Sequence, residues 1–155
     1  MSRPVKKICF AASSGGHFEQ LMMLKPLMYK YDSFILTERA GYEVNVPVRS
    51  YWLRQVNRHD KLFIPRMIFN TVVSLKVYIQ ERPDVVVCTG VLATIPMCFI
   101  SKLFGGELVY IESFAKLTSG TETGRLLSRF ADRFYVQWES MLDVYPRAVY
   151  VGSVY

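Results

Sequence analysis

Apolar runs of strand length alternate along this chain with segments of helical periodicity, and that alternation leaves few folds open. Strands are predicted at residues 5–12, 33–37, 50–53, 84–89, 108–112, 133–137 and 148–151, and helices at 18–30, 61–80, 93–104, 124–131 and 139–145. Alternating strands and helices form a mostly parallel sheet with helices on both faces. The 155 residues suffice for one domain and are too few for two. We therefore predict an α/β fold, a single Rossmann-like domain over residues 1–155.

Two prolines limit the predicted helices. Pro26 falls inside the segment 18–30, where its missing N–H predicts a kink or an early end. Pro83 ends the helix over 61–80, and the apolar run at 84–89 that follows is of the kind buried on both faces of a parallel sheet.

The net charge narrows the class of partner. Lysine and arginine total 19 against 13 carboxylates, so the net charge is +6. That surplus suits an acidic lipid surface or a phosphorylated substrate. No basic block is longer than Lys6-Lys7, so the sequence does not favour a nucleic-acid partner.

The cysteines, the N-terminal segment and the longest apolar stretch indicate a protein with reduced thiols and no helix across the membrane. Cys9, Cys88 and Cys98 are odd in number and far apart in apolar runs, which indicates reduced core thiols in a cytoplasmic protein and no metal site. We expect no signal peptide before the first strand. The apolar stretch 62–79 contains Arg66 and Lys76, so we expect a helix that does not cross the bilayer.

The first strand leads into a helix through a turn of unusual composition. Ser13, Ser14, Gly15 and Gly16 are followed by His17. Glycines let the backbone approach a ligand closely, and a helix N-terminus offers free N–H groups, so the turn is predicted to bind phosphate or diphosphate. The alternative is a tight strand-to-helix turn that needs glycine and a capping serine.

Further polar residues follow other strands at what becomes the same edge of the sheet. Glu112 ends an apolar strand, a common place for a base or a hydroxyl-binding group; the alternative is a helix cap or a partner for Lys116 or Arg125. The remaining candidates for acceptor binding are Thr89, Gly90, Ser113, Gln137 and Trp138.

A dinucleotide-binding domain is a further alternative. Glu38 follows the second strand 22 residues after Gly16, about where a ribose-binding acid belongs. The turn, however, lacks the G-x-G-x-x-G pattern, because its helix-packing glycine is missing. No cofactor is predicted.

Four motifs recur in order in one family: Ser14-Gly15-Gly16-His17, Pro83-Asp84-Val85-Val86 before Thr89-Gly90, Tyr110-Ile111-Glu112-Ser113, and Val136-Gln137-Trp138. The chain resembles the membrane-associated subunit of the two-part glycosyltransferase that adds the second N-acetylglucosamine to dolichol diphosphate sugar. It is also similar to bacterial relatives in capsule and exopolysaccharide synthesis, and to the N-terminal half of the lipid-II-forming GT-B enzyme.

The resemblance implies a hexosyltransferase subunit that is active only with a partner chain carrying the nucleotide-sugar site. The acceptor would be a polyprenyl-diphosphate sugar, undecaprenyl in bacteria, and the expected reaction is galactosyl transfer from UDP-galactose, with glucuronosyl or N-acetylglucosaminyl transfer behind it. The expected location is the cytoplasmic face of the cell membrane, held peripherally. His17 or Glu112 would take the proton from the attacking hydroxyl. A non-catalytic recruiter that anchors the partner, and a standalone nucleotide-binding domain, remain alternatives.

Membrane contact is predicted for the basic, apolar helix that begins near residue 61. The residues expected to touch the membrane are Lys61, Phe63, Arg66, Met67 and Phe69. A fully buried core helix is the alternative.

Overall fold

The computed structural model describes residues 6–40, 45–90 and 92–155. The strands are β1 (Lys7–Ala12), β2 (Asp32–Glu38), β3 (Ser50–Leu53), β4 (Val85–Gly90), β5 (Glu107–Ile111), β6 (Arg133–Val136) and β7 (Val149–Tyr150). The helices are α1 (Gly16–Met22), α2 (Lys25–Lys30), α3 (Phe63–Glu81), α4 (Ile95–Leu103) and α5 (Glu122–Leu127), with 3-10 turns η1 (Leu92–Thr94) and η2 (Glu139–Leu142). Val5, where the first predicted strand begins, lies outside the described residues.

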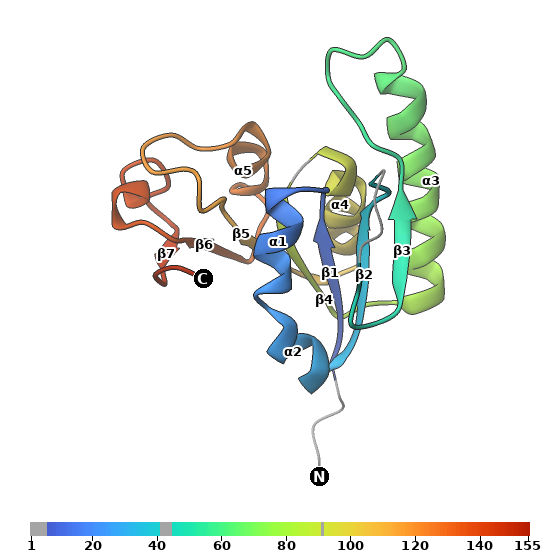
Figure 1. Cartoon of the computed structure of the whole chain (residues 1–155), viewed down its shortest axis with the longest axis horizontal. Helices are drawn as coiled ribbons and strands as arrows, with labels where there is room; N and C mark the ends of the chain where they lie inside the picture. Colours follow the sequence, from blue (N-terminus) through green and yellow to red (C-terminus); the bar gives the residue numbers. More distant parts are fainter. Residues whose placement is uncertain (1–5, 41–44, 91) are drawn as a thin grey trace.

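The seven strands of the described residues join one sheet in the order β3-β2-β1-β4-β5-β6-β7, and every neighbouring pair is parallel. Helices α1 and α2 cover one face, and α3 and α4 cover the other (Figure 1). The strand order reverses between β1 and β4, and ligands in such sheets bind outside the carboxyl ends of the strands at that reversal. The predicted single Rossmann-like sheet is confirmed.

Two apolar layers form the core, one on each face of the sheet. Phe18, Leu21 and Met28 bring α1 and α2 onto one face, while Val77 and Met97 bring α3 and α4 onto the other. All six residues of β4 are buried, as the continuous apolar run predicts. The three cysteines are free thiols inside this core.

Three predicted helices differ from those observed. The segment 18–30 divides into α1 and α2 because Pro26 has no N–H to continue α1, and it lies in the first turn of α2. The helix predicted over 124–131 begins earlier, because the Thr121 hydroxyl accepts a hydrogen bond from Gly124 N and caps α5. The helix predicted over 139–145 is wrong: η2 is a single turn, after which Tyr145 is buried in the core.

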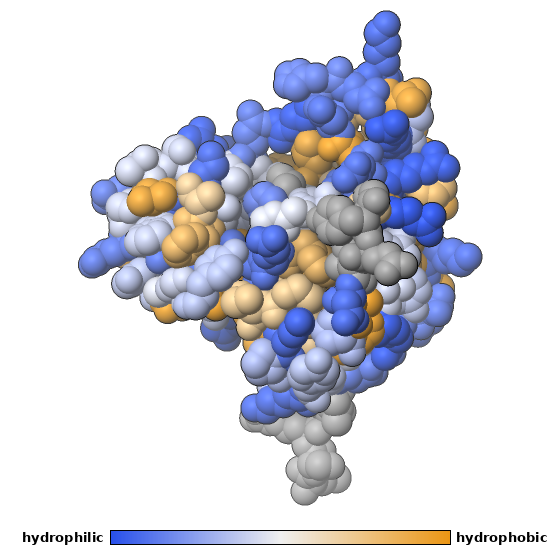
Figure 2. All heavy atoms as spheres, in the orientation of Figure 1, coloured by the Kyte–Doolittle hydropathy of each residue, from blue (hydrophilic) through white to orange (hydrophobic). Residues whose placement is uncertain are grey.

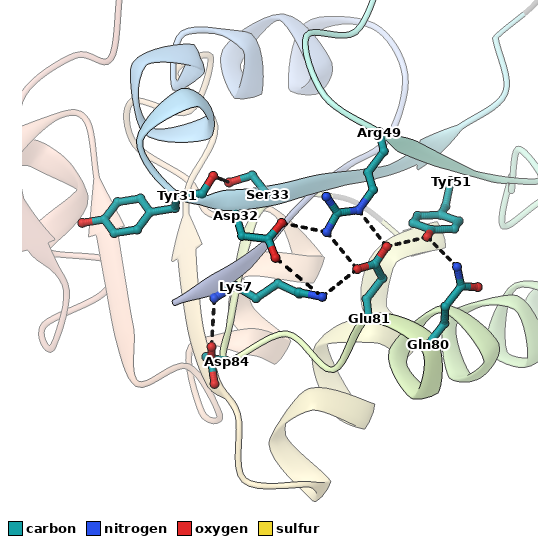
Figure 3. Close-up of polar contacts among 9 residues, drawn as sticks. All are labelled: Lys7, Tyr31, Asp32, Ser33, Arg49, Tyr51, Gln80, Glu81 and Asp84. Carbon is teal, nitrogen blue, oxygen red and sulfur yellow. Dashed lines mark hydrogen bonds and ion pairs between the residues drawn. The ribbon is translucent and has the colours of Figure 1, made fainter. Parts of the chain in front are cut away.

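An ionic network joins the amino ends of the strands. This edge of the sheet lies opposite the carboxyl edge, where ligands are expected to bind. Arg49 donates to Glu81 and to Asp32 over 2.8 Å each, Lys7 donates to Glu81 over 3.1 Å, and the Tyr51 hydroxyl donates to Glu81 (Figure 3). The hydrogen bond from Arg49 holds the pKa of Glu81 at about 2. The network therefore joins the starts of β1 and β2, the β3 region and the end of α3.

Candidate functional site

The predicted turn lies at the carboxyl edge, beside the point where the strand order reverses. Ser13 N donates to Gly90 O over 2.7 Å, which joins the end of β1 to the end of β4. Gly15 has φ +77°, a left-handed conformation that glycine adopts readily, and its carbonyl accepts the first hydrogen bonds of α1. Apart from its chain neighbours, no described residue has an atom within 4 Å of a Cβ built on Gly15 or Gly16. The two glycines of the turn are therefore open to a ligand.

His17 is half-buried and held in one orientation. Its Nδ1 lies 2.9 Å from Thr89 O, and the Thr89 hydroxyl donates to His17 O over 2.8 Å. Because a carbonyl can only accept, Nδ1 is the donor in this bond, and in the neutral imidazole Nε2 is then the acceptor nitrogen. Gly90 leaves room for the ring, since a Cβ there would lie 3.1 Å from His17 Nδ1.

Glu112 follows β5, as predicted, and its side chain is buried. Its carboxylate accepts hydrogen bonds from Ser113 N (2.8 Å), the Tyr145 hydroxyl (2.7 Å) and Thr121 N (3.1 Å). Burial and the hydrogen bond to Glu112 raise the pKa of Tyr145. Lys116 and Arg125, the partners considered from sequence, make no hydrogen bond or ion pair with Glu112 among the described residues. The carboxylate therefore orders the loop between β5 and α5.

Gln137, Trp138 and Ser113 fasten the same part of the chain. Gln137 Nε2 donates to Glu112 O over 2.9 Å, and Gln137 Oε1 accepts from Val154 N. Trp138 Nε1 donates to Phe114 O over 2.7 Å, and Ser113 Oγ accepts from Ala115 N. These three side chains thus have internal partners, on the β5–β6 side of the turn.

Gln20, which the sequence did not single out, links the two groups of candidates. From α1, its amide donates to Glu112 O and accepts from Phe114 N over 3.0 Å. The side chain is buried, so α1 and the loop after β5 are held in register.

A cavity of about 400 Å³ beside the turn contains residues that sequence reasoning missed. Ser13 and Glu38 form one side, and Asn57, Arg58 and His59 from the segment after β3 form the other. Glu38 is buried and accepts from Ser14 N, Ser14 Oγ and Val56 N. In the sequence, only the polar run 57–60 could have pointed to these residues, because the segment around it has no helix or strand periodicity. Glu38, considered as a ribose ligand, holds the turn instead.

Helix α3 buries several polar side chains and exposes several aliphatic ones. Asn70, Ser74 and Glu81 are buried together with Val77, whereas another face exposes aliphatic side chains by 39–62%. We call that face the α3 stripe; it consists of Ile64, Ile68, Val72, Leu75 and Ile79. Figure 2 shows apolar patches among hydrophilic residues on the side of the molecule where α3 lies. The alternative of a fully buried core helix is therefore wrong.

The five residues predicted to touch the membrane do not form this stripe. Phe63, Arg66 and Met67 are half-buried, and Arg66 donates to Asp60 over 2.7 Å. Lys61 precedes the helix and is exposed, and Phe69 is 38% exposed beneath Arg54. Helical periodicity identified the helix and not the face that packs inward.

Two searches of the described residues gave negative results. None of their helices combines the length and apolarity needed to cross a bilayer. Within residues 6–40, 45–90 and 92–155, no group of three or more His, Cys, Asp or Glu side chains is arranged to hold a metal ion.

The fold occurs in known enzymes. MurG from Acinetobacter baumannii superposes with a TM-score of 0.74 at 17% identity, over 96% of this chain and 45% of MurG. A UDP-GlcNAc 2-epimerase from Methanocaldococcus jannaschii gives 0.71 at 14% identity, over 91% of this chain and 42% of the epimerase. The chain thus spans less than half of either protein. At these identities the likeness shows the fold alone, which is that of the N-terminal half of a GT-B enzyme, as predicted.

Sequence relatives are more informative. The human UDP-N-acetylglucosamine transferase subunit ALG14 is 26% identical, over 95% of this chain and 82% of the human protein. The Candida albicans protein of the same name is 35% identical, over 90% of this chain and 74% of its own length. Residues 46–154 match the family described as "Oligosaccharide biosynthesis protein Alg14 like". This match spans well over half of the sequence, and the chain belongs to the Alg14-like family.

Proposed function

We propose that this chain is the acceptor-recognising, membrane-associated subunit of a two-chain glycosyltransferase. The observation that carries the proposal is that relatives matching almost the whole chain are named subunits of a UDP-N-acetylglucosamine transferase. A partner chain would bind the nucleotide sugar, and this chain, as one domain over residues 1–155, would bind a polyprenyl-diphosphate sugar. The open turn and the oriented His17 at the carboxyl edge support a site for that acceptor.

His17 is the group proposed to take the proton from the attacking hydroxyl. Its Nδ1 is engaged by Thr89 O, so Nε2 is the free acceptor for a hydroxyl proton. Glu112 is proposed as a positioning residue, because its oxygens already accept from Ser113, Thr121 and Tyr145. Backbone N–H groups of the turn would donate to the acceptor.

The identity of the donor sugar is a finer part of the proposal. The names of the relatives favour N-acetylglucosamine over the galactose expected from the sequence. Galactosyl transfer to an undecaprenyl-linked sugar in bacterial capsule or exopolysaccharide synthesis stays a prediction.

The α3 stripe supports peripheral attachment to a membrane. Five exposed aliphatic side chains along one helix favour transfer out of water, at about 25 cal/mol per Å² of apolar surface. The net charge of +6 adds attraction to anionic lipids. We place this attachment on the cytoplasmic face of the cell membrane.

The test is transfer of labelled sugar to a synthetic polyprenyl-diphosphate sugar. UDP-N-acetylglucosamine and UDP-galactose are each supplied to this chain alone, to the glycosyltransferase chain encoded by a neighbouring gene alone, and to both. Transfer that requires both chains supports the proposal. Equal transfer by the neighbouring chain alone contradicts it.

A non-catalytic recruiter is the second candidate, favoured by the internal hydrogen bonds that occupy Glu112. It predicts that both chains are needed at the membrane, but that replacement of His17 leaves the rate in detergent solution unchanged.

A further inference from the structure

A second cavity, of about 710 Å³, lies between the carboxyl ends of β2 and β3 and the first turns of α3. Three arginines line it, Arg39 from the end of β2, Arg54 from the end of β3, and Arg66 from α3. No acidic residue lines it among the residues that the structure describes. Arginine matches phosphate oxygens with paired N–H groups, so the cavity is suited to a phosphorylated ligand.

Arg54 is fixed before any ligand arrives. The side chain of the buried Asn70 accepts from Arg54 N and donates to Arg54 O, over 2.9 Å each. These two hydrogen bonds hold the backbone of Arg54 against α3. Its guanidinium stacks on Phe69, with Cζ 3.9 Å from the ring centroid. Stacking on a ring face leaves the N–H groups at the edge of the guanidinium available for hydrogen bonds. Such an arrangement reduces the entropy lost when an anion binds.

Arg39 and Arg54 carry charge that the described part of the chain leaves uncompensated. Neither has a carboxylate within ion-pair distance among the described residues, whereas Arg66 is paired with Asp60 over 2.7 Å. Two unpaired guanidinium groups in one cavity repel each other, and a bound dianion relieves that repulsion.

The predicted turn is electrostatically different. The buried carboxylate of Glu38 accepts from Ser14 N and Ser14 Oγ, so a negative charge already occupies the donors at the start of the turn. A diphosphate placed there would lie against that carboxylate, whereas the hydroxyls of a neutral sugar could donate to it.

The arginine-lined cavity also lies between the turn and the α3 stripe. Gln55 lines the cavity and donates through Nε2 to Ser14 Oγ over 3.1 Å. On the other side, the cavity is lined by Leu62, which directly precedes α3, and by Phe69 on α3, the helix that carries the stripe. A lipid-linked sugar has the same order of groups, with the sugar first, the diphosphate next and the apolar chain last.

We propose that this cavity binds the diphosphate of the lipid-linked acceptor through Arg39 and Arg54, and that the Ser13–Gly16 turn receives the sugar. This inference rests on the proposed function, which it refines by placing the diphosphate away from the glycine turn. The polyprenyl chain would leave the cavity past Phe69 toward the α3 stripe.

The test measures binding of the full chain to sedimenting phosphatidylcholine vesicles of three compositions. The first is phosphatidylcholine alone, the second contains a polyprenyl diphosphate, and the third contains phosphatidylglycerol at equal surface charge. The wild type is expected to prefer the diphosphate vesicles. Arg39→Gln and Arg54→Gln should each reduce that preference about tenfold, the loss of one charge-assisted contact to phosphate.

Arg129→Gln is the matched control, because Arg129 is an exposed arginine after α5, near the opposite edge of the sheet. It removes the same charge and should retain the preference. The inference is overturned if Arg39→Gln and Arg54→Gln bind the diphosphate vesicles as the wild type does, or if the wild type shows no preference for them. Equal losses on phosphatidylglycerol and diphosphate vesicles overturn it too, in favour of a general anionic-lipid surface.

The vesicle-binding measurements need neither the partner chain nor sugar transfer. If the chain binds diphosphate vesicles through Arg39 and Arg54 but supports no transfer, the diphosphate site is supported and the proposed function is contradicted. If transfer persists in both variants with an unchanged KM for the acceptor, the proposed function is supported and the diphosphate site in the cavity is contradicted.

Discussion

Nδ1 of His17 lies 2.9 Å from the carbonyl oxygen of Thr89, so the first turn of α1 is fixed to the end of a strand 72 residues later. The bond determines which ring nitrogen is free. An imidazole oriented in this way at the carboxyl edge can accept a proton without rearrangement. The two proposed roles of the chain, catalytic subunit and recruiter, therefore differ most clearly at His17.

His17→Ala should lower kcat/KM of the two-chain enzyme by about 10²- to 10⁴-fold, the usual contribution of a general base. The measurement is the initial rate of transfer in detergent solution, where membrane recruitment is not needed. Co-purification of the partner should be unchanged. A rate within twofold of the wild type would falsify the catalytic role and support the recruiter.

Gly90→Ala should reduce both stability and transfer. The position has φ +113°, and the new Cβ would lie 3.1 Å from His17 Nδ1, so the ring must move. We expect a loss of about 1–3 kcal/mol from the backbone conformation alone. Gly105→Ala is the control, because Gly105 has φ +83° with no atom within 4 Å of the new Cβ. Urea unfolding should show losses in both variants, and transfer should fall only in Gly90→Ala.

Tyr145→Phe should destabilise the loop after β5. The substitution removes the hydroxyl that donates to Glu112 Oε2 over 2.7 Å, at an expected cost of about 1–2 kcal/mol. Glu112→Ala should cost more, about 3 kcal/mol, since the partly buried donors of Ser113 and Thr121 lose their acceptor as well. Urea unfolding at pH 7 measures both. Equal stability of Glu112→Ala and the wild type would show that the carboxylate does not order the loop.

Stability should fall in acid through Glu81. Its pKa is lowered from 4.5 to about 2 in the folded chain, chiefly by the hydrogen bond from Arg49. A lowered folded-state pKa means that the stabilisation is complete above pH 4.5 and is lost as the pH falls toward 2. The contribution is on the order of 2–3 kcal/mol. Between pH 7 and pH 2.5, the free energy of unfolding should fall less steeply in Glu81→Gln than in the wild type. Parallel curves for the two proteins would exclude this role of Glu81.

Ile68→Ser combined with Val72→Ser should weaken membrane attachment. Each side chain is about 60% exposed, and transfer of an aliphatic side chain out of water contributes about 1.5–3 kcal/mol. Vesicle affinity should therefore fall at least about tenfold, while the melting temperature stays the same. Tyr29→Ser is the control, because Tyr29 is 68% exposed on α2, across the sheet from α3. Equal losses in both variants would show that the α3 stripe is not the contact surface.

The order of strands and helices could be predicted because each buried strand is a continuous apolar run, such as 84–89, that ends in glycine or a polar residue. Short elements escaped this reasoning. The 3-10 turn η2 has the composition of a helix, and its length depends on the burial of Tyr145 against Glu112, a contact across 33 residues.

The site could be predicted only where one segment supplies it. The turn and His17 are contiguous in sequence, so their composition shows them together. Arg39 and Arg54 come together because Glu38 pairs with Leu53 in the β2–β3 register, which no local pattern contains. The α3 stripe also escaped prediction, because the buried face of α3 contains Asn70 and Ser74 as well as Val77, so apolar residues alone do not identify that face.

The length of the α3 stripe has a consequence for how the protein would lie on a bilayer. Its residues extend from Ile64 to Ile79, about 22 Å of helix, so α3 would lie flat in the interface rather than stand upright in it. Because β1, β2 and β3 run alongside α3 (Figure 1), they too would lie roughly parallel to the membrane plane, and the carboxyl edge would open sideways at the level of the headgroups. A lipid-borne substrate would then enter by lateral diffusion and would never leave its leaflet.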